Sequence, residues 1–108
     1  MATPQYSLYL AGGGIALIST QSTSVPLSTT ATECQVVQLQ GISTNTSVIM
    51  VANSTARVLA TSRVGVPVYA GSTSVPVTIY ARDLSQVYID GISTEGVSYA
   101  YYTVGVPS

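Results

Sequence analysis

Few side chains in this sequence are suited to moving a proton or attacking a substrate. The chain has 108 residues and contains neither His nor Lys. A Ser or Cys nucleophile becomes reactive when a neighbouring base activates it, and His and Lys are the common bases. The single cysteine, Cys34, therefore has no evident activator in the sequence. We expect no catalytic residues and no enzymatic activity.

The acidic residues are the other candidates for chemistry. All charged side chains of the chain are Glu33, Asp83, Asp90, Glu95, Arg57, Arg63 and Arg82. Asp83, Asp90 and Glu95 lie in one stretch, where a carboxylate pair or a calcium site is conceivable. They lack the dense spacing of oxygen ligands found in calcium-binding loops. We interpret them as solvated turn residues or ion-pair partners of Arg82, and we predict no metal and no other cofactor.

The eight tyrosines are more informative than the charged residues. Successive side chains of a strand point to opposite faces, so Tyr99 and Tyr101 share one face of a C-terminal strand and Tyr102 takes the other. Tyr is enriched at protein interfaces, although here it could also replace the missing Phe and Trp in the core. Both interpretations stay open, with Tyr102 favoured for an interface. The candidate interface residues are Tyr99, Tyr101, Tyr102, Tyr88, Tyr6 and Tyr9.

These residues belong to a chain with an internal repeat of 50 residues. The words Ser22-Thr23-Ser24-Val25-Pro26 and Gly41-Ile42-Ser43-Thr44 both return 50 positions later. A gapless overlay of residues 15–50 on 65–100 gives 11 identities in 36 positions. A fixed period indicates a repeated structural unit. We predict two copies of one β-unit packed into a single domain.

The repeat also bears on the cysteine and on two potential glycosylation sequences. Cys34 stands where the second unit has Leu84. This correspondence favours a core position for Cys34, with an intermolecular disulfide as the less favoured alternative. The sequences beginning at Asn45 and Asn53 match the acceptor pattern, but we interpret both as accidents of the high Ser and Thr content.

The predicted fold is all-β, either a β-sandwich or a small barrel. Short apolar or alternating runs recur at strand length, separated by Gly, Pro and Ser/Thr turns, and no run has helical spacing. About eight to ten strands are expected. Residues 1–14 are predicted to form an N-terminal strand or arm, in which Gly12, Gly13 and Gly14 break the strand as a turn or bulge. Residues 15–108 are predicted to form the sandwich.

The low charge of the chain constrains its partners. Charged residues make up 6% of the sequence, against about 25% in an average domain. The net charge of −1 provides no footprint for nucleic acid, and no apolar run is long enough to cross a membrane. Residues 1–5 lack the basic stretch of a signal peptide. Because charged residues are depleted at interface cores, we expect other protein chains to cover much of the surface.

Two segments resemble a pattern in small structural proteins of tailed bacteriophages. The first is ATECQVVQLQ at residues 31–40, followed by Asn45-Thr46 and by VIMV at residues 48–51. The second extends from residue 70 through ARDLSQVYIDG at residues 81–91 and ends with GVSY at residues 96–99. The similarity covers roughly residues 31–102 and concerns structural rather than catalytic motifs.

This resemblance implies a virion component, in particular a head decoration (cement) protein. Such proteins are β-rich, bind outside the capsid lattice as dimers or trimers and reinforce the joints between capsomers. The expected partners are the major capsid protein or other virion subunits, and further copies of the chain. The expected location is the virion, assembled in the bacterial host cytoplasm. The alternatives are a tail or neck component and a carbohydrate-binding, lectin- or adhesin-like module.

Overall fold

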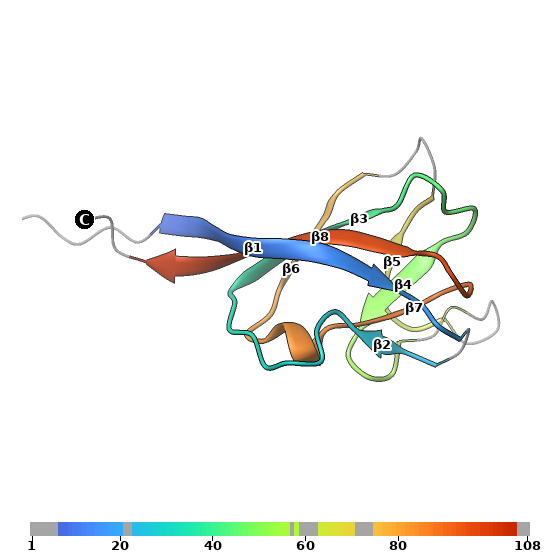
Figure 1. Cartoon of the computed structure of the whole chain (residues 1–108), viewed down its shortest axis with the longest axis horizontal. Coiled ribbons are helices and arrows are strands. Elements are labelled where there is room, and N and C mark those ends of the chain that lie inside the picture. Colours follow the sequence, from blue (N-terminus) through green and yellow to red (C-terminus); the bar gives the residue numbers. More distant parts are fainter. Residues whose placement is uncertain (1–6, 21–22, 57, 59–62, 71–74, 106–108) are drawn as a thin grey trace, which may run out of the picture.

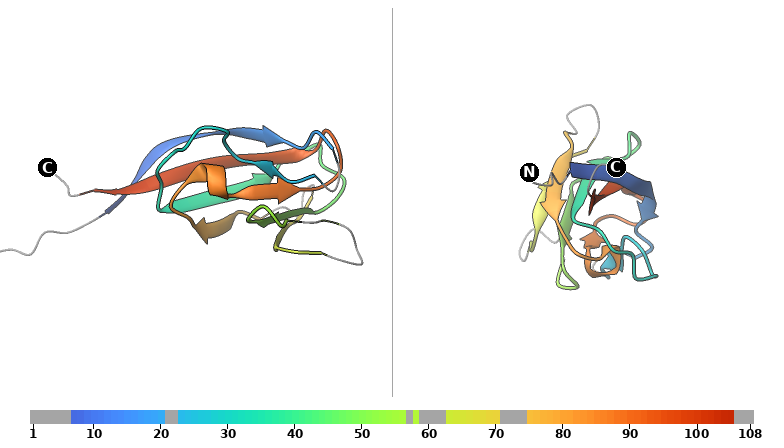
Figure 2. Two further views of the ribbon diagram at one scale, coloured as in Figure 1. Left: turned by 90° about the horizontal axis from the view of Figure 1, so that it is seen from below. Right: turned by 90° about the vertical axis from the view of Figure 1, so that its left-hand side faces the viewer.

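A computed structural model describes residues 7–20, 23–56, 58, 63–70 and 75–105. Their strands form two four-stranded antiparallel sheets that face each other (Figures 1 and 2). Each sheet has two open edges, so the fold is a β-sandwich and not a closed barrel. The all-β prediction is confirmed, and of its two forms the sandwich is the one observed.

The long sheet contains, in order across the sheet, β1 (Ser7–Leu17), β8 (Gly96–Gly105), β3 (Val36–Gly41) and β6 (Val77–Tyr80). The short sheet contains, in order, β2 (Val25–Pro26), β7 (Tyr88–Asp90), β4 (Ile49–Ala52) and β5 (Val66–Val68). A single 3₁₀ turn, η2 (Leu84–Gln86), interrupts the strands among the described residues. The ends of β1 and β8 extend together beyond the rest of the sandwich (Figure 1).

The two halves of the chain are interlaced. Each sheet takes two strands from the first half (β1–β4) and two from the second half (β5–β8). The order of strands in the long sheet is β1-β8-β3-β6. If four is added to each strand number, and counting continues from β1 after β8, this order becomes β5-β4-β7-β2. That is the order of the short sheet, read from the other edge. The repeat therefore appears as two halves that exchange strands rather than as two modules placed side by side.

Backbone contacts near the middle of each half follow the same symmetry. Glu33 and Asp83, which are 50 residues apart, form an isolated antiparallel bridge. The hydrogen bonds beside it are Cys34 N–H to Arg82 C=O (2.9 Å) and Leu84 N–H to Thr32 C=O (3.0 Å). A shift of 50 residues converts each of these bonds into the other. The contacts thus have the symmetry of an approximate two-fold axis between the sheets.

The core lies between the sheets and is built from alternate residues of the strands. Val37 and Leu39 of β3 face inward, as their spacing predicts, and Ile49 and Val51 of β4 face them from the short sheet. Cys34 is fully buried in this core, which confirms the prediction from its counterpart Leu84.

The three consecutive glycines do not break the first strand, so the predicted turn is wrong, whereas a bulge, the other predicted form, is present directly before them. β1 continues through them as one strand of 11 residues and pairs with β8, with a bulge between Leu10 and Gly12. Gly12 lies opposite Tyr101, and Gly14 lies opposite Tyr99. A Cβ atom on Gly12 would lie 2.7 Å from the Tyr101 Oη, and one on Gly14 would lie 3.0 Å from the Tyr99 Oη.

The glycines therefore leave room for two tyrosine rings that cross β1 from β8. This arrangement is an aromatic side chain covering a glycine of the neighbouring strand. It also means that residues 7–14 belong to the long sheet, since β1 crosses the boundary between arm and sandwich that the sequence placed at residue 14.

Candidate interaction surface

The outer face of the long sheet has no charged side chain. None of the residues in β1, β8, β3 and β6 is Asp, Glu, Lys or Arg. In the described part of the chain, the charged residues lie in the connecting segments, except for Asp90 at the end of β7. Arg57 is not among the described residues. An interface core is depleted of charge in the same way.

Four large aliphatic side chains of β1 extend along this face. Leu8, Leu10, Ile15 and Leu17 are 51%, 67%, 66% and 55% exposed. All four lie opposite even-numbered residues of β8, because the bulge after Leu10 shifts the alternation by one residue. The odd-numbered residues Tyr99 and Tyr101 of β8 pack against the core instead. We call Leu8, Leu10, Ile15 and Leu17 the β1 apolar row.

The tyrosines proposed from the sequence are divided between the two faces of β8. Tyr99 and Tyr101 face inward, and the Tyr99 hydroxyl donates a hydrogen bond to the Leu27 carbonyl (3.3 Å). Tyr102 lies on the outer face, where its hydroxyl donates to the Gln38 Oε1 (3.2 Å). The predicted alternation of the three residues is therefore present, and Tyr102 alone of them joins the uncharged face.

The remaining candidates lie away from Tyr102. Tyr9 is exposed on the projecting part of β1, opposite Thr103. Tyr88 is half-buried in β7, and Tyr6 lies outside the described residues. Tyr80 was not among the candidates, yet it is 85% exposed on the other edge strand of the long sheet. The β1 apolar row was also missed, because only the position of the bulge shows that its four members share a face.

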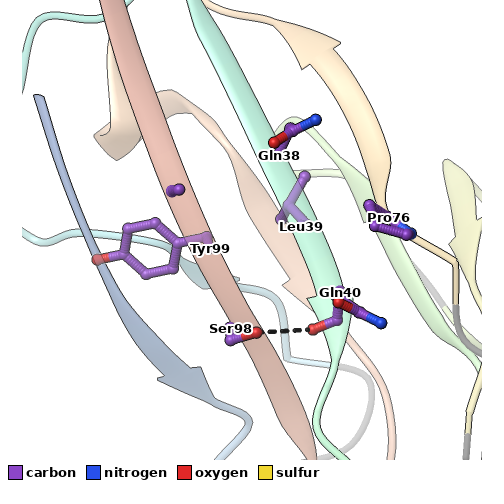
Figure 3. Close-up of a pocket in the computed structure, with 7 residues that line it drawn as sticks. Gln38, Leu39, Gln40, Pro76, Ser98 and Tyr99 are labelled. Carbon is purple, nitrogen blue, oxygen red and sulfur yellow. Dashed lines mark hydrogen bonds between the residues drawn. The ribbon is translucent and has the colours of Figure 1, made fainter. Parts of the chain in front are cut away.

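A shallow hollow crosses the outer face between β8, β3 and β6 (Figure 3). Its polar lining includes Gln38, Gln40 and Ser98, and the Ser98 hydroxyl donates to the Gln40 carbonyl (3.5 Å). Tyr99 also lines the hollow, and its ring is directed toward β1, where it lies across Gly14 (Figure 3).

Two buried polar residues join the loops at one end of the sandwich. Asn45 hydrogen-bonds both backbone groups of Gly96, with Nδ2 donating to the carbonyl (2.7 Å) and Oδ1 accepting from N–H (3.2 Å). Glu95 accepts hydrogen bonds from the N–H of Thr46 (2.7 Å), the Thr46 hydroxyl (2.8 Å) and the N–H of Ser47 (3.1 Å). Burial alone would raise the pKa of Glu95, but these hydrogen bonds hold that pKa below its ordinary value.

The other acids and the cysteine also make structural contacts. Asp83 Oδ1 accepts from the N–H groups of Thr32 and Ser85 and from the Ser85 hydroxyl, which lowers the pKa of Asp83. Asp90 Oδ2 accepts from the N–H of Val58 (2.9 Å). Burial, and secondarily the charge of Asp83, raises the pKa of the Cys34 thiol, which disfavours the nucleophilic thiolate.

Within the described ranges, no cluster of three or more His, Cys, Asp or Glu side chains could hold a metal ion. In the same part of the chain, no helix has the length and apolar character needed to span a membrane. No family model, no curated protein and no solved structure matches this chain.

Proposed function

We propose that this chain is a structural subunit of a tailed-bacteriophage particle, of the head decoration type, which binds the assembled lattice and stabilises it. The observation that carries the proposal is the outer face of the long sheet, which has no charged residue and displays the β1 apolar row. The phage assignment itself depends on the sequence resemblance over residues 31–102.

The uncharged face supports a role in binding protein. Burying apolar surface is favourable by roughly 25 cal/mol per Å², and a partner that covers the β1 apolar row removes four large side chains from water. A polar but uncharged rim of Gln38, Gln40 and Tyr102 lies beside the row. Such a rim forms hydrogen bonds across an interface without the desolvation cost of buried ions.

The mechanism of stabilisation is thermodynamic. A folded module that binds the assembled lattice, and not the separate capsid subunits, shifts the equilibrium toward the assembled form. Its partners are the major capsid protein or other virion subunits, together with further copies of the chain, and its location is the virion. No observation of the described residues favours the carbohydrate-binding alternative.

The test uses particles of the encoding phage from which this chain has been deleted. We expect the purified chain to rebind these particles saturably in co-sedimentation and to raise the temperature at which they open. Imaging of the particles with and without the chain then locates it on the head, neck or tail. Failure of the wild-type chain to bind any part of the particle would overturn the proposal.

A matched pair of variants tests which surface binds. Leu10→Gln changes the most exposed member of the β1 apolar row, and Tyr69→Gln changes an exposed residue beyond β5 of the short sheet. We expect Leu10→Gln to weaken particle binding at least about tenfold, which corresponds to about 1.4 kcal/mol, and Tyr69→Gln to leave it unchanged. The reverse pattern would show that the short sheet faces the lattice.

A further inference from the structure

The four edge strands of the sandwich differ in how they are protected from pairing with another chain. β2 contains Pro26, β5 contains Pro67, and β6 directly follows Pro76. Proline lacks the N–H that a ladder needs, so it blocks an edge. β1 is the fourth edge, and over its 11 residues it contains neither proline nor a charged residue. At the 50-residue offset, Leu17 of β1 stands where β5 has Pro67.

The open side of β1 has a defined set of backbone groups. The N–H of Ile18 donates to Glu95 C=O (2.8 Å), and Ile18 C=O accepts from the N–H of Thr94 (2.9 Å). Ile18 therefore points its backbone groups toward the strand that follows Thr94, which is β8. Backbone direction alternates along an antiparallel strand, so the groups of Gly13, Ile15 and Leu17 face the open edge.

The chemistry of this edge fits a second copy of the same strand. When a strand pairs with itself across a two-fold axis, any charged residue near the centre meets an identical charge, and the uncharged β1 avoids that repulsion. An antiparallel pair centred on Ile15 sets Ile15 against Ile15 of the second copy. It also sets each Leu17 opposite a Gly13, where the missing side chain leaves space.

We propose that two copies of this chain pair antiparallel through residues 13–17 of β1, centred on Ile15, and join their long sheets into one eight-stranded sheet. The three residues that face the edge in each copy supply about six main-chain hydrogen bonds. Residues that oppose each other across a ladder lie on the same side of it, so the uncharged outer faces of both copies form one surface.

This dimer forms without a phage particle, so its test is separate from that of the proposed function. The register predicts one specific crosslink. Opposed residues of a hydrogen-bonded antiparallel pair have Cα atoms about 5.5 Å apart, within the range of a disulfide. Residue 15 meets its own copy at the axis, whereas the two copies of residue 17 are about 13 Å apart along the strands.

The experiment compares Ile15→Cys with Leu17→Cys under mild oxidation of the purified full chain. Both positions are exposed and β1 is an edge strand, so neither change disturbs the core, and the native Cys34 is buried. We expect a covalent dimer from Ile15→Cys and at least tenfold less from Leu17→Cys. Equal crosslinking of both variants, or none in either, would overturn the proposed pairing.

A second measurement needs no cysteine. The wild-type chain is expected to show a mass that rises from one copy to two with concentration in sedimentation equilibrium. Ile15→Lys sets two positive charges against each other and should abolish this rise, whereas Tyr80→Lys makes a similar change on the opposite edge strand and should not. A wild-type chain that stays monomeric over the whole concentration range would overturn the dimer.

Discussion

Asn45 and Glu95 occupy equivalent positions 50 residues apart and make equivalent contacts with different side chains. Asn45 accepts a hydrogen bond from the N–H of Gly96, the residue after Glu95. In the same way, Glu95 accepts a hydrogen bond from the N–H of Thr46, the residue after Asn45. The amide and the carboxylate therefore close the two loops against each other across the approximate two-fold axis. Asn45 is also buried with its amide engaged, so its match to a glycosylation acceptor is not usable in the folded chain.

Replacing Glu95 by Gln should reduce the free energy of unfolding by about 1–2 kcal/mol at pH 7, because a charge-assisted set of hydrogen bonds is weakened. The folded state lowers the pKa of Glu95, so this contribution is present above the ordinary value of 4.5 and is lost as the pH falls through the lower folded value. Urea titrations of both proteins between pH 7 and pH 2 measure the difference, which should shrink below pH 4.5.

Glu33→Gln is the matched control, since Glu33 is an exposed carboxylate at the backbone bridge. We expect it to change the free energy of unfolding by less than about 0.5 kcal/mol, as surface substitutions commonly do. A loss as large as that of Glu95→Gln would show that general charge, and not the loop contact, is responsible.

The buried Cys34 should react with a thiol reagent only when the chain unfolds. Its thiol is enclosed in the core and its pKa is raised, so both access and thiolate content are low. Labelling at pH 8 in buffer and in denaturing urea should differ in rate by at least about a hundredfold, with a cysteine introduced at the exposed position Tyr69 (Tyr69→Cys) as the fast reference. Equal rates for Cys34 in both solvents would contradict its core position.

At the scale of the element, β1 and β8 depend on each other through two glycine–tyrosine pairs. The rings of Tyr99 and Tyr101 lie where side chains of Gly14 and Gly12 would otherwise be. The pairing keeps a strand with three consecutive glycines in the sheet, since the rings cover backbone that glycine leaves bare. The bulge at Leu10/Gly12 then brings the two parts of the β1 apolar row onto one face.

Gly14→Ala should destabilise the chain by about 1–3 kcal/mol, because the new methyl group meets the Tyr99 ring. In a Tyr99→Ala background the same substitution should cost less, since the ring is gone. The two single variants and the double variant form a cycle whose coupling energy is measured by urea unfolding. Strict additivity would show that the ring and the glycine do not depend on each other.

At the scale of the whole molecule, the interlaced halves make the sandwich a single cooperative unit. Every sheet contains strands from both halves, and the Glu33–Asp83 bridge joins the halves. A half removed from the chain would keep strands whose pairing partners belong to the other half. β4, for example, would lose β7 and β5, the only two strands that it pairs with in the described sheets.

Cutting the chain between residues 58 and 63 should therefore give two fragments that do not fold alone but recover the sandwich when mixed. Circular dichroism and amide NMR spectra of each fragment, and of their equimolar mixture, measure this. Mixing should restore the dispersed spectrum of the intact chain. A fragment that shows such a spectrum by itself would contradict the strand exchange.

The all-β class, the 50-residue repeat and the core position of Cys34 could all be predicted from the amino-acid sequence. These features depend on local alternation and on identities at a fixed offset, which can be read along the chain. The sequence also predicted that Tyr99 and Tyr101 share one face and that Tyr102 takes the other, since a strand alternates its side chains. The assignment to a phage particle remains a prediction from the same source.

Which residues form the exposed face, and how the two halves combine, became evident from the folded structure alone. The glycines of β1 appeared to be a break because their tyrosine partners lie more than 80 residues away in sequence. The shared face of Leu10 and Ile15 depends on the bulge in the pairing with β8, and the exchange of strands depends on pairs such as β1–β8 and β3–β6, whose residues lie far apart in the sequence. Such pairings are set by contacts between distant segments, and no local pattern in the sequence records them.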